Sequence, residues 1–251
     1  MSPSKLQGST GHIATARLGL LGLALSACLG NSLAQGRGDV EGQLYSPGPF
    51  DRLQVEGLTQ VKLSQGDKDQ VFIVGDPELQ KTVQLRLVNQ QLRIEPSGGW
   101  KFWNNARLQL EISMRELKQL TLAGASDVHA PGPLRLQGLT VRISGAGQVR
   151  LDDLMAERLD FNVSGAGDGQ LRGQVGQLNL GISGKGKLLA DHLRTGRAQV
   201  NISGIGNAQL WVVEDLAVHI SGVGSVEYWG QPQVTRQTSG LATIKSLGEK
   251  R

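Results

Sequence analysis

Serine and glycine recur in this 251-residue chain at a spacing that invites a chemical interpretation. A glycine loop that binds phosphate needs a helix directly after it, because the N–H groups at the helix start meet the anion. Each Ser-Gly-x-Gly tetrad of this chain is followed by alternating apolar and polar residues instead. The tetrads, 18 to 20 residues apart, are therefore interpreted as structural corners and not as nucleotide sites. The corner residues are Ser144, Gly145, Gly147, Ser164, Gly165, Gly167, Ser183, Gly184, Gly186, Ser203, Gly204, Gly206, Ser221, Gly222 and Gly224.

Calcium is another ligand that glycine-rich repeats can bind. Such repeats supply several carboxylate and carbonyl oxygens at every turn. Only one of the five residues that follow the second glycine is acidic, and one is a lysine. We therefore expect no metal site and no cofactor. These five residues are Gln148, Asp168, Lys187, Asn207 and Ser225.

Histidines and paired acids are the candidates for catalysis. His219 is expected to point outward, two residues before Ser221. A Ser–His–acid arrangement stays open, although the chain has no nucleophile elbow. The pairs Asp152-Asp153 and Glu214-Asp215 fall where solvated turn acids are expected, whereas glycoside cleavage needs two carboxylates at a defined separation in a groove. We assign no catalytic residue.

Aromatic residues are the strongest candidates for a binding surface. Trp211 and Trp229 each lie eight residues after a tetrad serine, so both are expected on one outward face. They would form a platform for a glycan ring or a partner protein, or else cover a loop or the C-terminal segment. The cluster of Trp100, Phe102 and Trp103 is expected to cap the end of the repeats, where apolar side chains would be exposed, or to contact a membrane or partner.

The residues around each tetrad define the elements that position these side chains. Apolar residues lie five, three and one positions before the serine and resume five and seven positions after it, which is the alternation of a half-buried β-strand. A repeat of about 20 residues cannot bury its apolar face alone, but stacked copies share a core. We predict an all-β fold, a β-solenoid (β-helix) with two or three short strands per coil. The alternative is a propeller, whose blades need about 40 residues. One core column is expected to contain Val141, Phe161, Leu180, Val200 and Val218.

The tetrad itself makes two further predictions about each corner. The glycines fall on the inward phase of the alternation, where a side chain would crowd the corner, and glycine also permits a positive φ if the corner needs one. The serines are expected to stack from coil to coil and to hydrogen-bond their neighbours in a ladder.

Composition limits the classes of function. The chain is 39% hydrophobic and only 4% aromatic, which fits thin aliphatic cores. Its formal charge of +4 is not gathered in a basic run, so nucleic acid is not an expected partner. A single cysteine excludes an internal disulfide.

The N-terminus predicts export. Basic residues precede an apolar run from Leu18 to Leu29 that is typical of a signal peptide and too short to span a membrane. Leu25-Ser26-Ala27-Cys28 resembles a lipobox, in which Cys28 would be acylated after cleavage before it. The alternative is cleavage after Ala34 without an anchor. Contact with a membrane is expected only through this lipid.

The predicted organisation follows from these segments. Residues 1–34 form the signal peptide, 35–49 a tether, 50–122 an N-terminal β region, 123–245 the repeat solenoid and 246–251 a polar tail beyond its end. In the β region, Asp76 is expected to cap a short helix that starts at Pro77 and ends near Val83.

Several of these features occur together in a known family. Val61 to Gly66 and Val71 to Asp76 form a leading strand pair, and a helix, Leu92-Arg93-Ile94 and serial Ser-Gly-x-Gly units follow behind a signal peptide. Over residues 50 to 245 the chain resembles the bacterial family described as "putative auto-transporter adhesin, head GIN domain". The resemblance implies a β-helical protein of the exported or envelope class. It supplies no catalytic residues.

The sequence thus predicts an exported, non-enzymatic binding, adhesion-type or structural module of the periplasm, outer membrane or cell surface. The expected partner is a glycan or an envelope protein. Two alternatives stay open: a polysaccharide-active enzyme on a β-helix, and an envelope scaffold that assembles through its ends.

Overall fold

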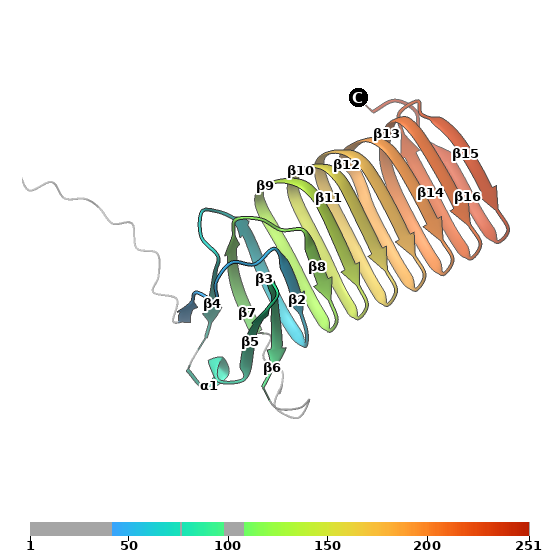
Figure 1. The fold of residues 1–251 in the computed structure, drawn as a ribbon. Helices are drawn as coiled ribbons and strands as arrows, with labels where there is room; N and C mark the ends of the chain where they lie inside the picture. Colours follow the sequence, from blue (N-terminus) through green and yellow to red (C-terminus); the bar gives the residue numbers. More distant parts are fainter. Residues whose placement is uncertain (1–41, 76, 98–107, 251) are drawn as a thin grey trace, which may run out of the picture. The chain divides into compact units, whose positions relative to one another are not determined.

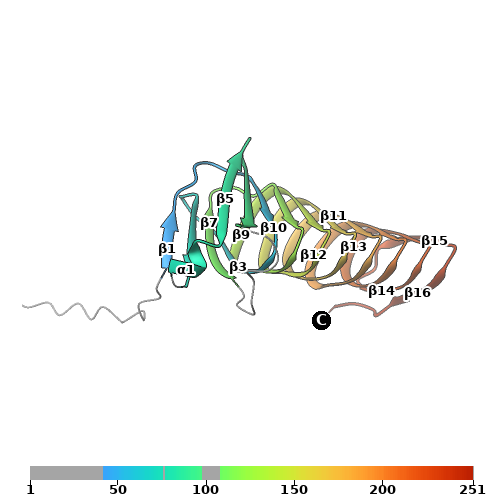
Figure 2. The ribbon, with the colours of Figure 1, turned by 90° about the horizontal axis from the view of Figure 1, so that it is seen from below.

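The computed structural model describes residues 42–75, 77–97 and 108–250, which belong to one compact unit, residues 39–251. Five long strands make up most of it. Each of them winds through one coil and pairs in parallel with the next, so the coils follow one another in chain order (Figure 1; Figure 2). The predicted all-β solenoid is confirmed. The five strands are β9 (Ala125–Ile143), β10 (Ala146–Val163), β11 (Ala166–Ile182), β12 (Lys185–Ile202) and β13 (Ile205–Ile220).

The predicted core column is confirmed by the strand register. Val141 pairs with Phe161, Phe161 with Leu180, Leu180 with Val200, and Val200 with Val218. All five side chains are buried, as are the apolar residues on both sides of each tetrad. The expected two or three short strands per coil are instead one strand of 16 to 19 residues. Backbone pairing continues around the bends and is interrupted by register shifts, such as the one between Leu151 and Asp153.

The tetrad glycines are required by close packing between coils. A Cβ on Gly165 would lie 2.1 Å from the carbonyl oxygen of Gly145 in the preceding coil. A Cβ on Gly167 would lie 2.6 Å from the Ile143 side chain, which fills the inward position there. The positive φ that glycine permits is not used, because no tetrad glycine adopts it. Space, and not backbone conformation, therefore selects glycine.

The tetrad serines bond to the backbone and not to one another. The hydroxyl of Ser144 donates to the carbonyl of Leu122 at 3.2 Å, and that of Ser164 donates to the carbonyl of Ile143 at 3.5 Å. The predicted ladder between serines is therefore wrong. Backbone bonds hold the corner instead, with Ser164 N–H donating to the same Ile143 oxygen at 2.9 Å.

The N-terminal region adds two coils in an order that differs from the chain order. β2 pairs in parallel with both β6 and β8, and β3 pairs in parallel with both β7 and β9, so the β2–β3 coil lies between the β6–β7 coil and the repeats. The strands predicted in this region are present. The strands of these two coils are β2 (Arg52–Val55), β3 (Leu58–Gln65), β6 (Gln91–Pro96) and β7 (Leu108–Met114), and β8 (Gln119–Leu122), which was not predicted, pairs with β2 and β9.

Antiparallel strands cover the free edge of the β6–β7 coil. β4 (Gln70–Val74) pairs with β7, β1 (Gly42–Tyr45) pairs with β4, and β5 (Val83–Val88) pairs with β6. The helix α1 is shorter than predicted: it covers Pro77–Gln80, and β5 begins at Val83. In the described ranges, no helix is long and apolar enough to cross a membrane.

The C-terminal end consists of one further coil. β14 (Val223–Trp229) and β15 (Gln233–Thr238) both pair with β13, and β16 (Leu241–Ser246) pairs with β14. The polar tail was predicted to lie beyond this end, and that prediction is wrong. It returns along the side of the coils, because Lys250 contacts Trp211, Trp229 and Asp191.

Candidate functional site

A flat polar surface is formed by the strand segments that precede the tetrads. In each coil, the residues four and two positions before the tetrad serine point outward, between buried neighbours. Because paired strands lie about 4.8 Å apart, these side chains form two parallel rows across the coils. The first row is Thr140, Asp160, Asn179, Gln199 and Ala217, and the second is Arg142, Asn162, Gly181, Asn201 and His219.

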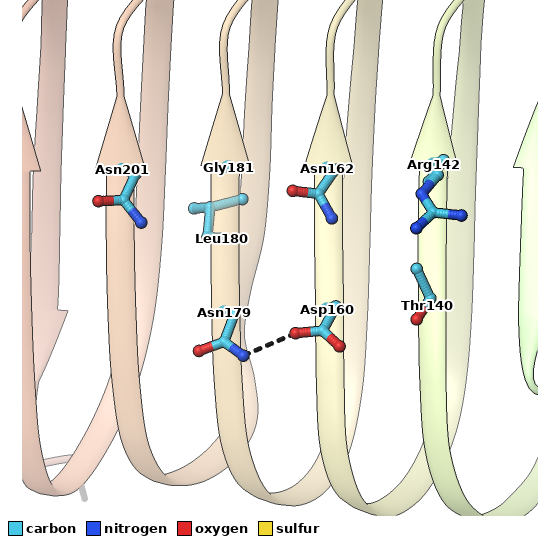
Figure 3. Close-up of a pocket in the computed structure, with 8 residues that line it drawn as sticks. All are labelled: Thr140, Arg142, Asp160, Asn162, Asn179, Leu180, Gly181 and Asn201. Carbon is cyan, nitrogen blue, oxygen red and sulfur yellow. Dashed lines mark hydrogen bonds between the residues drawn. The ribbon is translucent and has the colours of Figure 1, made fainter.

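Gly181 interrupts the second row. It lies between Asn162 and Asn201, whose side chains stand on either side of it in Figure 3. The missing side chain leaves a cavity of about 190 Å³, and an adjoining cavity of about 200 Å³ extends toward the corner serines. We call this hollow the Gly181 recess and define it by Arg142, Asp160, Asn162, Asn179, Gly181 and Asn201.

Two side chains of the recess are hydrogen-bonded to each other, and two others have amides without a described partner. Asn179 Nδ2 donates to Asp160 Oδ1 at 2.6 Å, so these two side chains hold each other (Figure 3). The amides of Asn162 and Asn201 make no hydrogen bond to another described residue. The Asn162 amide leans over the gap, since a Cβ on Gly181 would lie 2.6 Å from its Oδ1.

These side chains offer both donors and acceptors within one hollow. Each free amide has two N–H donors and one carbonyl acceptor, Arg142 adds donors, and Asp160 adds acceptor capacity. A ligand that fits must therefore present both kinds of group, as sugar hydroxyls do. The described residues contain no group of three or more His, Cys, Asp or Glu placed to hold a metal ion.

The second candidate surface is the tryptophan pair. Trp211 and Trp229 pair in register on β13 and β14, and both are half-buried. The ammonium group of Lys250 lies 5.7 Å from the centre of the Trp211 ring and 4.8 Å from that of Trp229. The pair thus covers the C-terminal segment, which was the alternative to an open platform. Its role as a ligand surface stays a prediction.

The histidines do not meet a serine nucleophile within the described ranges. His129 Nε2 lies 2.7 Å from Asp152 Oδ2, and Arg150 Nε donates to the other oxygen of that carboxylate at 2.9 Å. Burial alone would raise the pKa of Asp152, but the hydrogen bonds from His129 and Arg150 outweigh it and lower the pKa. His219 is exposed in the polar row, and no described residue is its acid partner. The His129–Asp152 hydrogen bond therefore links β9 to β10, and the Arg150–Asp152 ion pair lies within β10.

The other paired acids also form surface ion pairs. Asp153 accepts from both terminal nitrogens of Arg135 at 3.0 and 2.9 Å, and this bond lowers the pKa of Asp153. Glu214 Oε2 lies 3.5 Å from Arg197 Nε. Both carboxylates are solvent-exposed, but Asp153 lies within β10 and Glu214 within β13, and not in turns after a strand as predicted.

A family model described as "Putative auto-transporter adhesin, head GIN domain" matches residues 49–232, which is most of the chain. The chain belongs to this family. No curated protein matches it.

Solved structures similar to this head GIN domain protein share its fold. A putative adhesin from Bacteroides fragilis is 23% identical with a TM-score of 0.75, and one from Parabacteroides merdae is 19% identical with a TM-score of 0.68. A putative lipid binding protein from Parabacteroides distasonis is 19% identical with a TM-score of 0.58. Each match covers 84% of this chain and 98% of the other.

Three sets of predicted residues lie outside the described residues: the signal peptide 1–34 with the lipidation candidate Cys28, the helix cap Asp76, and the cluster of Trp100, Phe102 and Trp103. All three stay predictions. Conversely, sequence reasoning missed the recess of this head GIN domain protein. The signal was present, because Gly181 is the one glycine at a position where the other repeats have Arg, Asn or His.

Proposed function

We propose that this head GIN domain protein is an exported, non-enzymatic binding module of the bacterial envelope that recognises a glycan at the Gly181 recess. The observation that carries the proposal is a one-residue gap in an otherwise continuous row of polar side chains. The family description and the relatives named as putative adhesins support a binding role.

Sugar hydroxyls suit the recess because each of them donates and accepts hydrogen bonds. Asn162 and Asn201 offer free amides on both sides of the gap, and two strand spacings of about 4.8 Å separate their backbones. That distance admits one sugar ring between the two side chains. Both asparagines lie on strands that are paired on each side, so little ordering of the site is needed when a ligand binds.

The acids of the recess support binding over hydrolysis. Glycosidases use two carboxylates about 5 to 9.5 Å apart. Asp160 is the carboxylate that lines the recess, and Asn179 already donates to it at 2.6 Å. A recess with this composition can hold a sugar through hydrogen bonds, but it lacks the paired acid and base of a hydrolase.

Export is supported by the apolar N-terminal run and by the lipobox-like segment that ends at Cys28. An acylated Cys28 would anchor the binding module to a membrane. Mass spectrometry of the mature N-terminus tests this part of the proposal. A diacylated or triacylated Cys28 supports the anchor, whereas a free N-terminus at Gln35 supports the unanchored form.

The glycan proposal is tested by filling the gap. Gly181→Asn completes the row with the residue used by both neighbouring coils, so the strand should keep its fold. Binding of the wild type and of this variant to an array of bacterial and animal oligosaccharides is compared. We expect the wild type to bind a defined set, and Gly181→Asn to lose at least tenfold in affinity for it.

A matched control places the same side chain elsewhere on this surface. Ala217→Asn changes an exposed residue of the first row, outside the recess, and should leave the affinity unchanged. Asn162→Ala should weaken binding about 3- to 10-fold, the value of one hydrogen bond. Equal binding by the wild type and by a correctly folded Gly181→Asn variant would refute the recess as the site.

A further inference from the structure

The contact between the C-terminal segment and the tryptophan pair contains more than apolar cover. The ammonium of Lys250 lies near both rings, at 4.8 Å from Trp229 and 5.7 Å from Trp211. It also lies 3.4 Å from Asp191 Oδ2. Three side chains from three successive coils therefore converge on one ammonium group.

The Lys250 side chain is well enclosed for a lysine. Only 17% of it is exposed, and Asp191 is 25% exposed. Removing an ammonium from water is unfavourable unless charge and ring faces replace the lost hydration. The carboxylate of Asp191 supplies the opposite charge, and the two indoles supply the aromatic faces that attract cations most strongly.

The backbone next to Lys250 is held independently of its side chain. Leu247 N–H donates to the Tyr228 carbonyl at 2.8 Å, and Gly230 N–H donates to the Gly248 carbonyl at 2.9 Å. Gln231 Nε2 donates to Glu249 Oε1 at 2.7 Å. Loss of the Lys250 side chain alone should therefore empty the space between the rings and leave the tail in place.

From this geometry we propose that Asp191, Trp211 and Trp229 form a recognition site for an alkylammonium group, the cation site, which Lys250 of the chain itself fills in this structure. An external alkylammonium ligand binds there when Lys250 leaves. This site is separate from the Gly181 recess, which contains other side chains, and the proposal does not depend on glycan binding.

Competition with Lys250 sets the expected affinities. A tethered side chain acts at a high effective concentration, of millimolar order for short flexible links. A free cation must overcome that advantage in the wild type but not after Lys250 is truncated. Lys250→Ala should therefore bind small cations more tightly than the wild type, and Lys250→Arg should resemble the wild type because it keeps a cation in the site.

The experiment is a titration of the full exported chain followed by the indole N–H signals of Trp211 and Trp229 in NMR spectra. The probes are tetramethylammonium and n-butylammonium chloride, with sodium chloride at equal ionic strength as the reference. We expect saturable shifts of both signals in Lys250→Ala, with at least fivefold tighter binding than in the wild type. Adding Asp191→Asn to Lys250→Ala should weaken that binding at least threefold. The stronger of the two probes identifies quaternary or primary ammonium as the preferred class.

Two outcomes would overturn the cation site. One is the absence of saturable shifts in Lys250→Ala beyond those caused by sodium chloride. The other is binding that is unaffected by Asp191→Asn. Circular dichroism of each variant checks the fold, and if Lys250→Ala does not fold, Lys250→Met provides the same comparison with an uncharged side chain of similar length.

Discussion

The two ends of the solenoid are closed in different ways. A terminal coil leaves backbone N–H and C=O groups unpaired along its edge and exposes the end of the core. At the N-terminal end, antiparallel strands cover the edge: β4 pairs with β7, and β5 pairs with β6. At the C-terminal end no described strand covers β15 and β16. Val234 and Ile244 still pack against the core there, but other inward positions become polar.

The change of composition is clearest in the core column. Val218 pairs with Arg236 of β15, and Ile220 pairs with Thr238. Tyr228 of β14 pairs with Ser246 of β16. An inward-facing charge at an edge discourages pairing with a further strand. Added antiparallel strands thus cover the N-terminal end, whereas polar and charged side chains on β15 and β16 protect the C-terminal end. Both arrangements disfavour a scaffold that assembles through the ends of the solenoid.

The comparison predicts that a substitution in the interior of the core column lowers the free energy of unfolding much more than a substitution at its C-terminal end. Phe161→Ala removes a fully buried ring packed between two coils and should lower the free energy of unfolding by about 3–5 kcal/mol. Arg236→Ala, at the end of the same column, should change it by less than about 0.5 kcal/mol. Urea unfolding measures both values. Similar losses for the two variants would contradict the distinction between interior and end.

Alanine substitutions at two glycines should differ in their effect on stability, by less than the substitutions in the core column. Gly165→Ala would place a Cβ 2.1 Å from one backbone oxygen and 2.4 Å from another, so we expect a loss of about 2–3 kcal/mol. Gly132→Ala, in β9, meets no atom within 4 Å and should change stability by less than about 0.5 kcal/mol. Both are measured by urea unfolding. A tolerated Gly165→Ala would show that the corners are less tightly packed than the structure indicates.

The smallest expected effect concerns Asp152, which bonds to His129 of β9 and to Arg150 of β10. The pKa of Asp152 is lower in the folded state, so its stabilisation is present above the unfolded pKa of about 3.9 and is lost as pH falls through the folded pKa. Asp152→Asn should cost about 0.5–1 kcal/mol at pH 7. The difference from the wild type should shrink below pH 4. A difference that stays constant from pH 7 to pH 3 would show that the charge of Asp152 is not involved.

The repeat coils could be predicted from the sequence because every residue of a repeat has a counterpart one period away. Phe161 was placed in its column by this argument alone. The position of the β2–β3 coil could not be predicted, because strands without a tetrad carry no mark of their pairing order. The return of Lys250 depends on contacts with three side chains that lie up to 59 residues before it, which no local pattern links to it.

For the candidate surfaces too, the repeat pattern predicts which residues face outward but not which tertiary contacts they make. The outward position of Trp211 and Trp229 came from the alternation, whereas their contact with Lys250 came from the tertiary structure. Gly181 falls on the outward phase of the same alternation, and the alternation alone does not mark it as a gap. In a regular row, the missing side chain is the informative one.

The central claim, that the gap at Gly181 binds a glycan, is tested most directly by the side-chain amide signals of Asn162 and Asn201 in NMR spectra. On titration with the oligosaccharide that binds best on the array, we expect both amide signals to shift and saturate with one dissociation constant. Shifts confined to other residues, with both amides unchanged at saturation, would contradict the account.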